Sequence, residues 1–99
     1  MKKLNLEDIK AFSFVKFIKV EPDVEKVLLY GSRARGDHKN SSDIDFCVVG
    51  NKISPKIWSK IVNLAETNTE TLLPIDIVHF DKLQNQELKS NIVLDGVEL

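Results

Sequence analysis

Residues 31–45 constrain the fold of this chain more than any other stretch. The apolar run Val27-Leu28-Leu29-Tyr30 leads into a Gly31-Ser32 step, and Asp43-Ile44-Asp45 leads into a second apolar run, Phe46-Cys47-Val48-Val49. Both runs have the length and the β-branched or aromatic content of short buried strands. The sequence therefore predicts two strands joined by a polar segment that carries a glycine turn and two carboxylates.

These two aspartates have the spacing that a metal site needs. Alternate side chains of a strand share a face, so we expect Asp43 and Asp45 to point the same way and Ile44 to point into the core. Neighbouring carboxylates repel each other unless a cation lies between them, and their hard oxygens suit Mg²⁺, which completes its shell with water and substrate phosphates. Gly31 permits a close backbone approach, and a helix that begins at Ser32 would direct N–H groups at a phosphate.

A third aspartate lies in a later predicted strand, Leu72 to Phe80. There Ile75 and Ile77 share one face, while Asp76 lies on the other. An aspartate among such apolar neighbours is expensive to bury without a partner. We therefore expect Asp76 to bind a cation or to have another functional role.

Basic residues are concentrated in the same polar segment, although the net charge of the chain is −1. The forked donors of Arg33 and Arg35 suit triphosphate oxygens. For His38 and Lys39, solvation of a loop is an equally good interpretation. Because the chain has no overall basic excess, we expect no direct nucleic-acid binding.

Two further residues have structural interpretations. Cys47 shares a strand face with Asp43 and Asp45, but a thiol is too soft for Mg²⁺, so we interpret it as a small core residue. As the single cysteine, it also excludes an internal disulfide. His79 alternates to the face opposite Asp76, which predicts a structural role.

The other apolar patterns predict helices. One covers Asn5 to Lys19, with Asn5 as N-cap and with more apolar positions than a small sheet can bury; its phenylalanines either all lie in the core or partly face a partner chain. Ser54-Pro55 is a strong start for a helix to about Glu66. A last helix is expected from Asp81, in a capping-box pattern, to about Gly96. The predicted fold class is α/β (α+β), a small mixed sheet of about three strands with helices on one side.

Length and composition limit the possibilities further. Ninety-nine residues, 42% of them hydrophobic and 29% charged, suit one small globular domain, so we expect residues 1–99 to form a single domain. No apolar run approaches the roughly 20 residues that cross a membrane, so we expect a cytoplasmic protein with no membrane partner.

The motifs in this stretch resemble those of a known superfamily. Gly31-Ser32, ten residues, then Asp43-Ile44-Asp45 is similar to the signature of the DNA polymerase beta-like nucleotidyltransferases. The segment Gly31-Ser32-Arg33-Ala34-Arg35-Gly36 resembles their minimal nucleotidyltransferase branch, which includes MntA-like antitoxins. The resemblance extends over nearly the whole chain, with Asp76 as the expected third aspartate, and implies a fold like the polymerase beta palm.

The resemblance also implies an activity and a cofactor. A nucleoside monophosphate, most commonly AMP from ATP, would pass to a hydroxyl group while pyrophosphate leaves. Asp43, Asp45 and Asp76 would hold two Mg²⁺ ions, with Mn²⁺ as a substitute, and Asp76 would assist deprotonation of the acceptor. Gly31 and Ser32 would hold the phosphates, with Arg33 and Arg35 beside them as nucleotide-binding residues.

Partners follow from the same resemblance. Minimal members occur with a separate all-helical partner of the HEPN type, and some act as antitoxins that adenylylate that partner. Two alternatives remain open: a nucleotide-binding module that neutralises its partner without chemistry, and a free-standing small-molecule nucleotidyltransferase. An oligomer is compatible with each of these functions.

Overall fold

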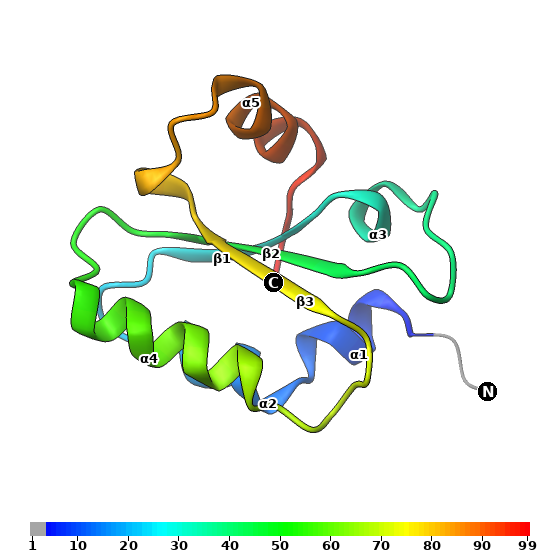
Figure 1. Cartoon of the computed structure of the whole chain (residues 1–99), viewed down its shortest axis with the longest axis horizontal. Helices are drawn as coiled ribbons and strands as arrows, with labels where there is room; N and C mark the ends of the chain where they lie inside the picture. Colours follow the sequence, from blue (N-terminus) through cyan, green and yellow to red (C-terminus); the bar gives the residue numbers. More distant parts are fainter. Residues whose placement is uncertain (1–3) are drawn as a thin grey trace.

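A computed structural model describes residues 4–99, and residues 1–3 of the predicted domain lie outside the described part (Figure 1). Within residues 4–99 the strands form one four-stranded sheet in the order β3-β2-β1-β4. Strand β1 (Lys26–Tyr30) pairs antiparallel with β2 (Ile44–Val49) and with β4 (Val97–Glu98), whereas β2 pairs parallel with β3 (Ile75–His79). A parallel pair needs a crossover connection, which helix α4 (Pro55–Glu66) supplies. The predicted mixed α/β fold class is confirmed, with a fourth strand that the sequence did not indicate.

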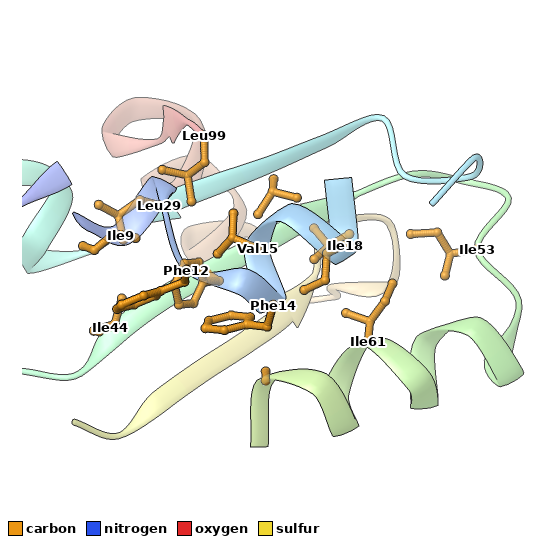
Figure 2. Packing of buried hydrophobic residues seen from close by; sticks show 14 residues of the cluster. Ile9, Phe12, Phe14, Val15, Ile18, Leu29, Ile44, Ile53, Ile61 and Leu99 are labelled. Carbon is orange, nitrogen blue, oxygen red and sulfur yellow. The ribbon is translucent and has the colours of Figure 1, made fainter. Parts of the chain in front are cut away.

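One face of the sheet carries the main core. Ile44, Phe46 and Val48 alternate along β2 and are fully buried there. Figure 1 shows that helices α1 (Leu6–Lys10), α2 (Ser13–Lys19) and α4 lie on this side. Their buried side chains include Ile9, Val15, Ile18, Ile61 and Ala65, several of which are labelled in Figure 2. Because alternate side chains of β2 point to this face, the strand packs against the helices through every second residue.

The opposite face is only partly apolar, and helix α5 (Gln86–Asp95) covers that part (Figure 1). Ile92 packs there with Tyr30 and Cys47 in a second, smaller cluster. The prediction of helices on one side of the sheet was therefore wrong. Because Tyr30 and Cys47 are apolar and alternate to this face, the sheet needs a cover on both sides.

The predicted helix from Asn5 to Lys19 is divided in two. Asn5 is the N-cap, as expected, and forms a capping box with Asp8. However, α1 ends at Lys10, and Phe12 has non-helical backbone torsions before α2 begins. This break turns the chain so that Phe12 and Phe14 are both buried, with stacked rings 5.6 Å apart. A straight helix cannot bury that many consecutive apolar positions on one stripe.

Helices α4 and α5 both begin after a residue that caps them, but the capping residue of α5 is not the predicted one. Ser54 caps α4 by accepting a hydrogen bond from the backbone N–H of Ile57, as expected from the sequence. Asp81 does not begin the last helix, because its side chain accepts a hydrogen bond from the Gly50 backbone N–H at 2.8 Å. Residues Phe80–Lys82 form a short 3-10 turn, η1, and Asn85 caps α5 instead. No helix in residues 4–99 has both the length and the apolar character to cross a membrane.

Candidate active site

Three aspartates lie at the end of the sheet where β2 and β3 begin, and two of them are paired across the strands. Asp45 and Asp76 are direct partners across the parallel β2–β3 pair, so their side chains lie on the same face. Asp43 lies one residue before β2 and is exposed. Farther along the strands, helix α5 covers this same face of the sheet. The apolar cluster under α5 includes Cys47 but not Asp45 or Asp76. The fold therefore leaves the predicted carboxylates uncovered at one end of an otherwise buried surface.

The backbone of Gly31 lies close to the Asp45 carboxylate. A Cβ atom at this position would lie 2.5 Å from Oδ2 of Asp45, which is closer than real contacts allow. The backbone of Gly31 also has φ 76° and ψ −156°, a combination that is essentially restricted to glycine. Glycine is thus required here for two reasons, its torsion angles and the proximity of Asp45.

The surroundings of Asp45 disfavour its ionised form. Burial raises the pKa of the Asp45 carboxyl above its ordinary value, and the negative charges of Asp76 and Asp43 raise this pKa further. The positive charge of Arg35 opposes the shift. A carboxylate whose ionisation is disfavoured by burial and by neighbouring negative charges is one that a cation would stabilise.

Tyr30 is a member of the site that the sequence did not single out. It is the β1 partner of Asp45, and its hydroxyl donates a 3.4 Å hydrogen bond to Oδ2 of Asp76. Burial, followed by the charges of Asp76 and Asp45, raises the pKa of Tyr30, so the hydroxyl remains a donor at physiological pH. Its place directly before Gly31 was visible in the sequence, but the cross-strand register that brings it to Asp76 was not.

The short helix α3 (Ser32–Arg35) follows Gly31 and begins at Ser32, as predicted. Ser32 is its first residue, and the early N–H groups of a helix have no partner within it. The guanidinium of Arg35 is 46% exposed and contacts Asp37 at 3.0 Å and Asp95 of α5 at 2.9 Å. These partners place Arg35 at the rim of the site, bridging α3 and α5.

Arg33 has a different environment from Arg35. Its side chain is buried, and its hydrogen bonds go to backbone carbonyl oxygens of residues 39, 40 and 42. The contacts of Arg33 within residues 4–99 are therefore those of a loop anchor, in contrast to the phosphate contacts expected of it. His38 and Lys39 lie on the same loop, where Lys39 is exposed.

Cys47 and His79 occupy the structural positions expected for them. Cys47 is fully buried, and this burial, together with the charge of Asp81, raises the pKa of its thiol to about 12. His79 stacks on Trp58 with ring centroids 5.1 Å apart, and its Nε2 lies 2.7 Å from the carbonyl oxygen of Gly50. Both residues stabilise the sheet and its connections.

The donor set can be tested for its fit to a divalent cation. Across residues 4–99, no group of three or more carboxylate, imidazole or thiol side chains encloses a common metal position. Mg²⁺ does not need such a cage, because it is usually bound by one or two protein carboxylates together with water and substrate phosphates. The neighbouring Asp45 and Asp76, with Asp43 exposed beside them, fit that incomplete coordination.

A mixed sheet flanked by helices, with paired aspartates opposite a glycine turn, defines the nucleotidyltransferase class of fold. Residues 13–99 match the model of the family described as polymerase beta, nucleotidyltransferase. This chain belongs to that family, which confirms the superfamily resemblance noted in its motifs. Among curated proteins, none matches this sequence.

Solved structures with a similar fold include toxin–antitoxin proteins. A mutant of the toxin–antitoxin MntA-HpeT is 23% identical, with a TM-score of 0.65 over 98% of this chain and 72% of that chain. A toxin–antitoxin with AMP-PNP is 20% identical, with a TM-score of 0.58 over 87% of this chain and 71% of that one. A proposed nucleotidyltransferase from Sulfolobus solfataricus is 24% identical, with a TM-score of 0.51 over 86% and 71%. At these identities the comparisons demonstrate a shared fold.

Proposed function

We propose that this protein is a divalent-metal-dependent nucleotidyltransferase that transfers AMP from ATP to a hydroxyl group of a protein partner, with pyrophosphate leaving. The observation that carries the proposal is the pairing of Asp45 with Asp76 across β2 and β3, opposite a glycine that cannot carry a side chain. Such a pair of carboxylates is costly in an apoprotein. It becomes favourable when cations and phosphates share the site.

Each residue has a distinct role in this reaction. Asp43, Asp45 and Asp76 hold Mg²⁺, or Mn²⁺ as a substitute. When bound, such ions neutralise the triphosphate and stabilise both the attacking and the leaving oxygens. Gly31 admits the phosphates close to the backbone, and Ser32 donates to them at the start of α3. Arg35 releases its contact with the exposed Asp37 to bind a phosphate oxygen, because surface ion pairs contribute little free energy, and it keeps its contact with the mostly buried Asp95.

Acceptor activation falls to Asp76. It is exposed, so a hydroxyl of a bound partner can reach it, and Tyr30 orients one of its two oxygens. The other oxygen is then available to accept the acceptor proton as the new P–O bond forms and pyrophosphate departs. Positioning and charge neutralisation supply most of the catalysis in this kind of transfer.

A protein partner is favoured by the surface of α2. Phe17 is 61% exposed and Val20 is 75% exposed, and together with Ser13 and Lys16 they line a hollow of about 300 Å³. Exposed apolar side chains that cluster in this way mark interaction sites. We propose that the partner is a helical protein of the HEPN type, and that this protein is its antitoxin. The fold shared with toxin–antitoxin structures supports that proposal.

Incubation of the neighbouring gene's product with this protein, ATP and Mg²⁺ tests the activity. We expect intact-mass spectrometry to show the partner heavier by one AMP per modified residue, and no change with Asp43→Asn or in EDTA. Phe17→Ser should weaken partner binding while leaving ATP binding unchanged. If the Asp43→Asn variant silences the partner as well as the unaltered protein does, with no added mass, the protein acts by binding alone and the enzymatic proposal is refuted.

A further inference from the structure

The buried arginine of α3 carries an inference beyond the reaction itself. The side chain of Arg33 is 9% exposed, and its hydrogen-bond partners in the described part of the chain are carbonyl oxygens. A buried guanidinium is costly unless its donors are satisfied. A buried position in which Nε and Nη2 both donate to backbone carbonyls suits a fixed structural contact better than the binding of a ligand that enters and leaves.

The partners of Arg33 all belong to one tight turn. Its Nε donates to the carbonyl oxygen of Ser42 at 3.1 Å, and its Nη2 donates to those of Asn40 at 3.1 Å and Lys39 at 3.4 Å. Ser42 closes the same turn, because its Oγ accepts from the Lys39 N–H at 2.9 Å and its N–H donates to the Lys39 carbonyl at 3.0 Å. The planar fork of the guanidinium thus holds the backbone of residues 39–42.

This turn ends directly at Asp43. In the described residues, the Asp43 side chain makes no hydrogen bond or ion pair, so its position depends on its backbone neighbours. On the C-terminal side, Ile44 is fully buried and its N–H donates to the Pro74 carbonyl at 3.0 Å. On the N-terminal side, the corresponding restraint is the contact of Arg33 with the Ser42 carbonyl.

We propose that Arg33 is a positioning residue that holds the turn at residues 39–42 and thereby sets the place of the Asp43 carboxylate at the metal site. This inference rests on the proposed function, in which Asp43 is a metal ligand. A displacement of about 1 Å in a catalytic group can lower a rate about 100-fold. Arg33 therefore acts on metal and rate through the backbone, without contact to nucleotide.

Hydrogen exchange of the metal-free protein tests the structural half of this proposal without any activity. In Arg33→Gln and Arg33→Lys we expect the amides of residues 39–43 to exchange at least about 10-fold faster, since a lysine has the charge of arginine but not its fork. Ser42→Ala removes the hydroxyl that accepts from the Lys39 N–H and leaves the Arg33 side chain unaltered, and it should also speed exchange at residues 39–43. Arg35→Lys, on the same helix but exposed, should leave exchange at residues 39–43 unchanged.

Metal binding tests the functional half. We expect Arg33→Lys to lower Mn²⁺ affinity, measured by calorimetry, about 3- to 10-fold, and we expect this effect to vanish in an Asp43→Asn background. In the transfer assay, Arg33→Lys should reduce kcat with little change in the KM for ATP, since Arg33 does not contact the nucleotide in this proposal.

The outcomes separate the two proposals. Unchanged exchange at residues 39–43 in both Arg33 variants would overturn the role of Arg33 and leave the proposed function intact. A loss of Mn²⁺ affinity that persists at full size with Asp43→Asn would also overturn it. Absence of Mn²⁺ binding in the unaltered protein would instead refute the proposed function, and with it Asp43 as a ligand.

Discussion

Replacing Gly31 with alanine should damage the site more than it damages the fold. The backbone at Gly31 has φ 76° and ψ −156°, and a non-glycine residue held there costs about 1–3 kcal/mol. The new Cβ would also lie 2.5 Å from Oδ2 of Asp45, where ordinary contact begins at 3.4 Å. The carboxylate would have to move by about 0.9 Å, which is the scale at which transfer rates fall about 100-fold.

Gly36 supplies a matched control for this prediction. It also has a positive φ, 90°, but a Cβ there would meet nothing within 4 Å. Gly36→Ala should therefore lose about 1–2 kcal/mol of unfolding free energy from the left-handed backbone alone. Urea denaturation would measure both losses, and calorimetry of ATP with Mn²⁺ would show weaker binding for Gly31→Ala only.

A double-mutant cycle separates backbone strain from the collision. In an Asp45→Ala background the collision is absent, so Gly31→Ala should cost only its backbone strain, and the two changes should be non-additive. Equal loss of Mn²⁺-ATP affinity in the Gly31 and Gly36 variants would refute the argument. The argument would also be refuted if the losses of unfolding free energy from Gly31→Ala and Asp45→Ala, measured in urea, were additive.

Two other changes probe the charges of the site. Asp45→Asn should raise the unfolding free energy at pH 7, because the raised pKa of Asp45 means that ionisation of this carboxyl destabilises the folded state. The protonated carboxyl contributes its full stability below its ordinary pKa near 3.8, and this contribution is lost as pH rises through the raised pKa. The advantage of the variant in urea should therefore disappear in acid, and an equal advantage at all pH values would contradict this origin. Tyr30→Phe removes the long bond to Asp76 and should cost about 0.5–1.5 kcal/mol in the same assay. A loss above about 3 kcal/mol would mean that the hydroxyl has a larger structural role.

Local signals predicted most of the elements, because caps and strand periodicity act over a few residues. The Asn5 N-cap, the Ser54-Pro55 helix start and the start of α3 at Ser32 were all predicted from neighbouring residues. The break at Phe12 and strand β4 depend on contacts with distant segments. Strand β4 has two residues and exists through its pairing with β1, so no local pattern could reveal it.

The site was predictable in its residue types and less so in its contacts. Alternation along β2 and the family motif pointed to Asp43, Asp45 and Asp76, but the pairing of Asp45 with Asp76 follows from the parallel register of two strands far apart in sequence. Arg33 and Arg35 have the same side chain and looked equivalent. Their difference arises from the fold of the turn at residues 39–42, which buries Arg33 and leaves Arg35 exposed.

The main core is what allows the carboxylates to remain side by side. A one-residue slip of β2 would turn Asp45 away from Asp76, but it would also move Ile44, Phe46 and Val48 out of the core. Exposing those three fully buried side chains costs about 5–9 kcal/mol at about 1.5–3 kcal/mol each. Repulsion between two close, partly exposed charges is on the order of 1–4 kcal/mol. Because the core term is the larger, the register of β2 holds, and the strand keeps a charge arrangement that a bound cation would make favourable.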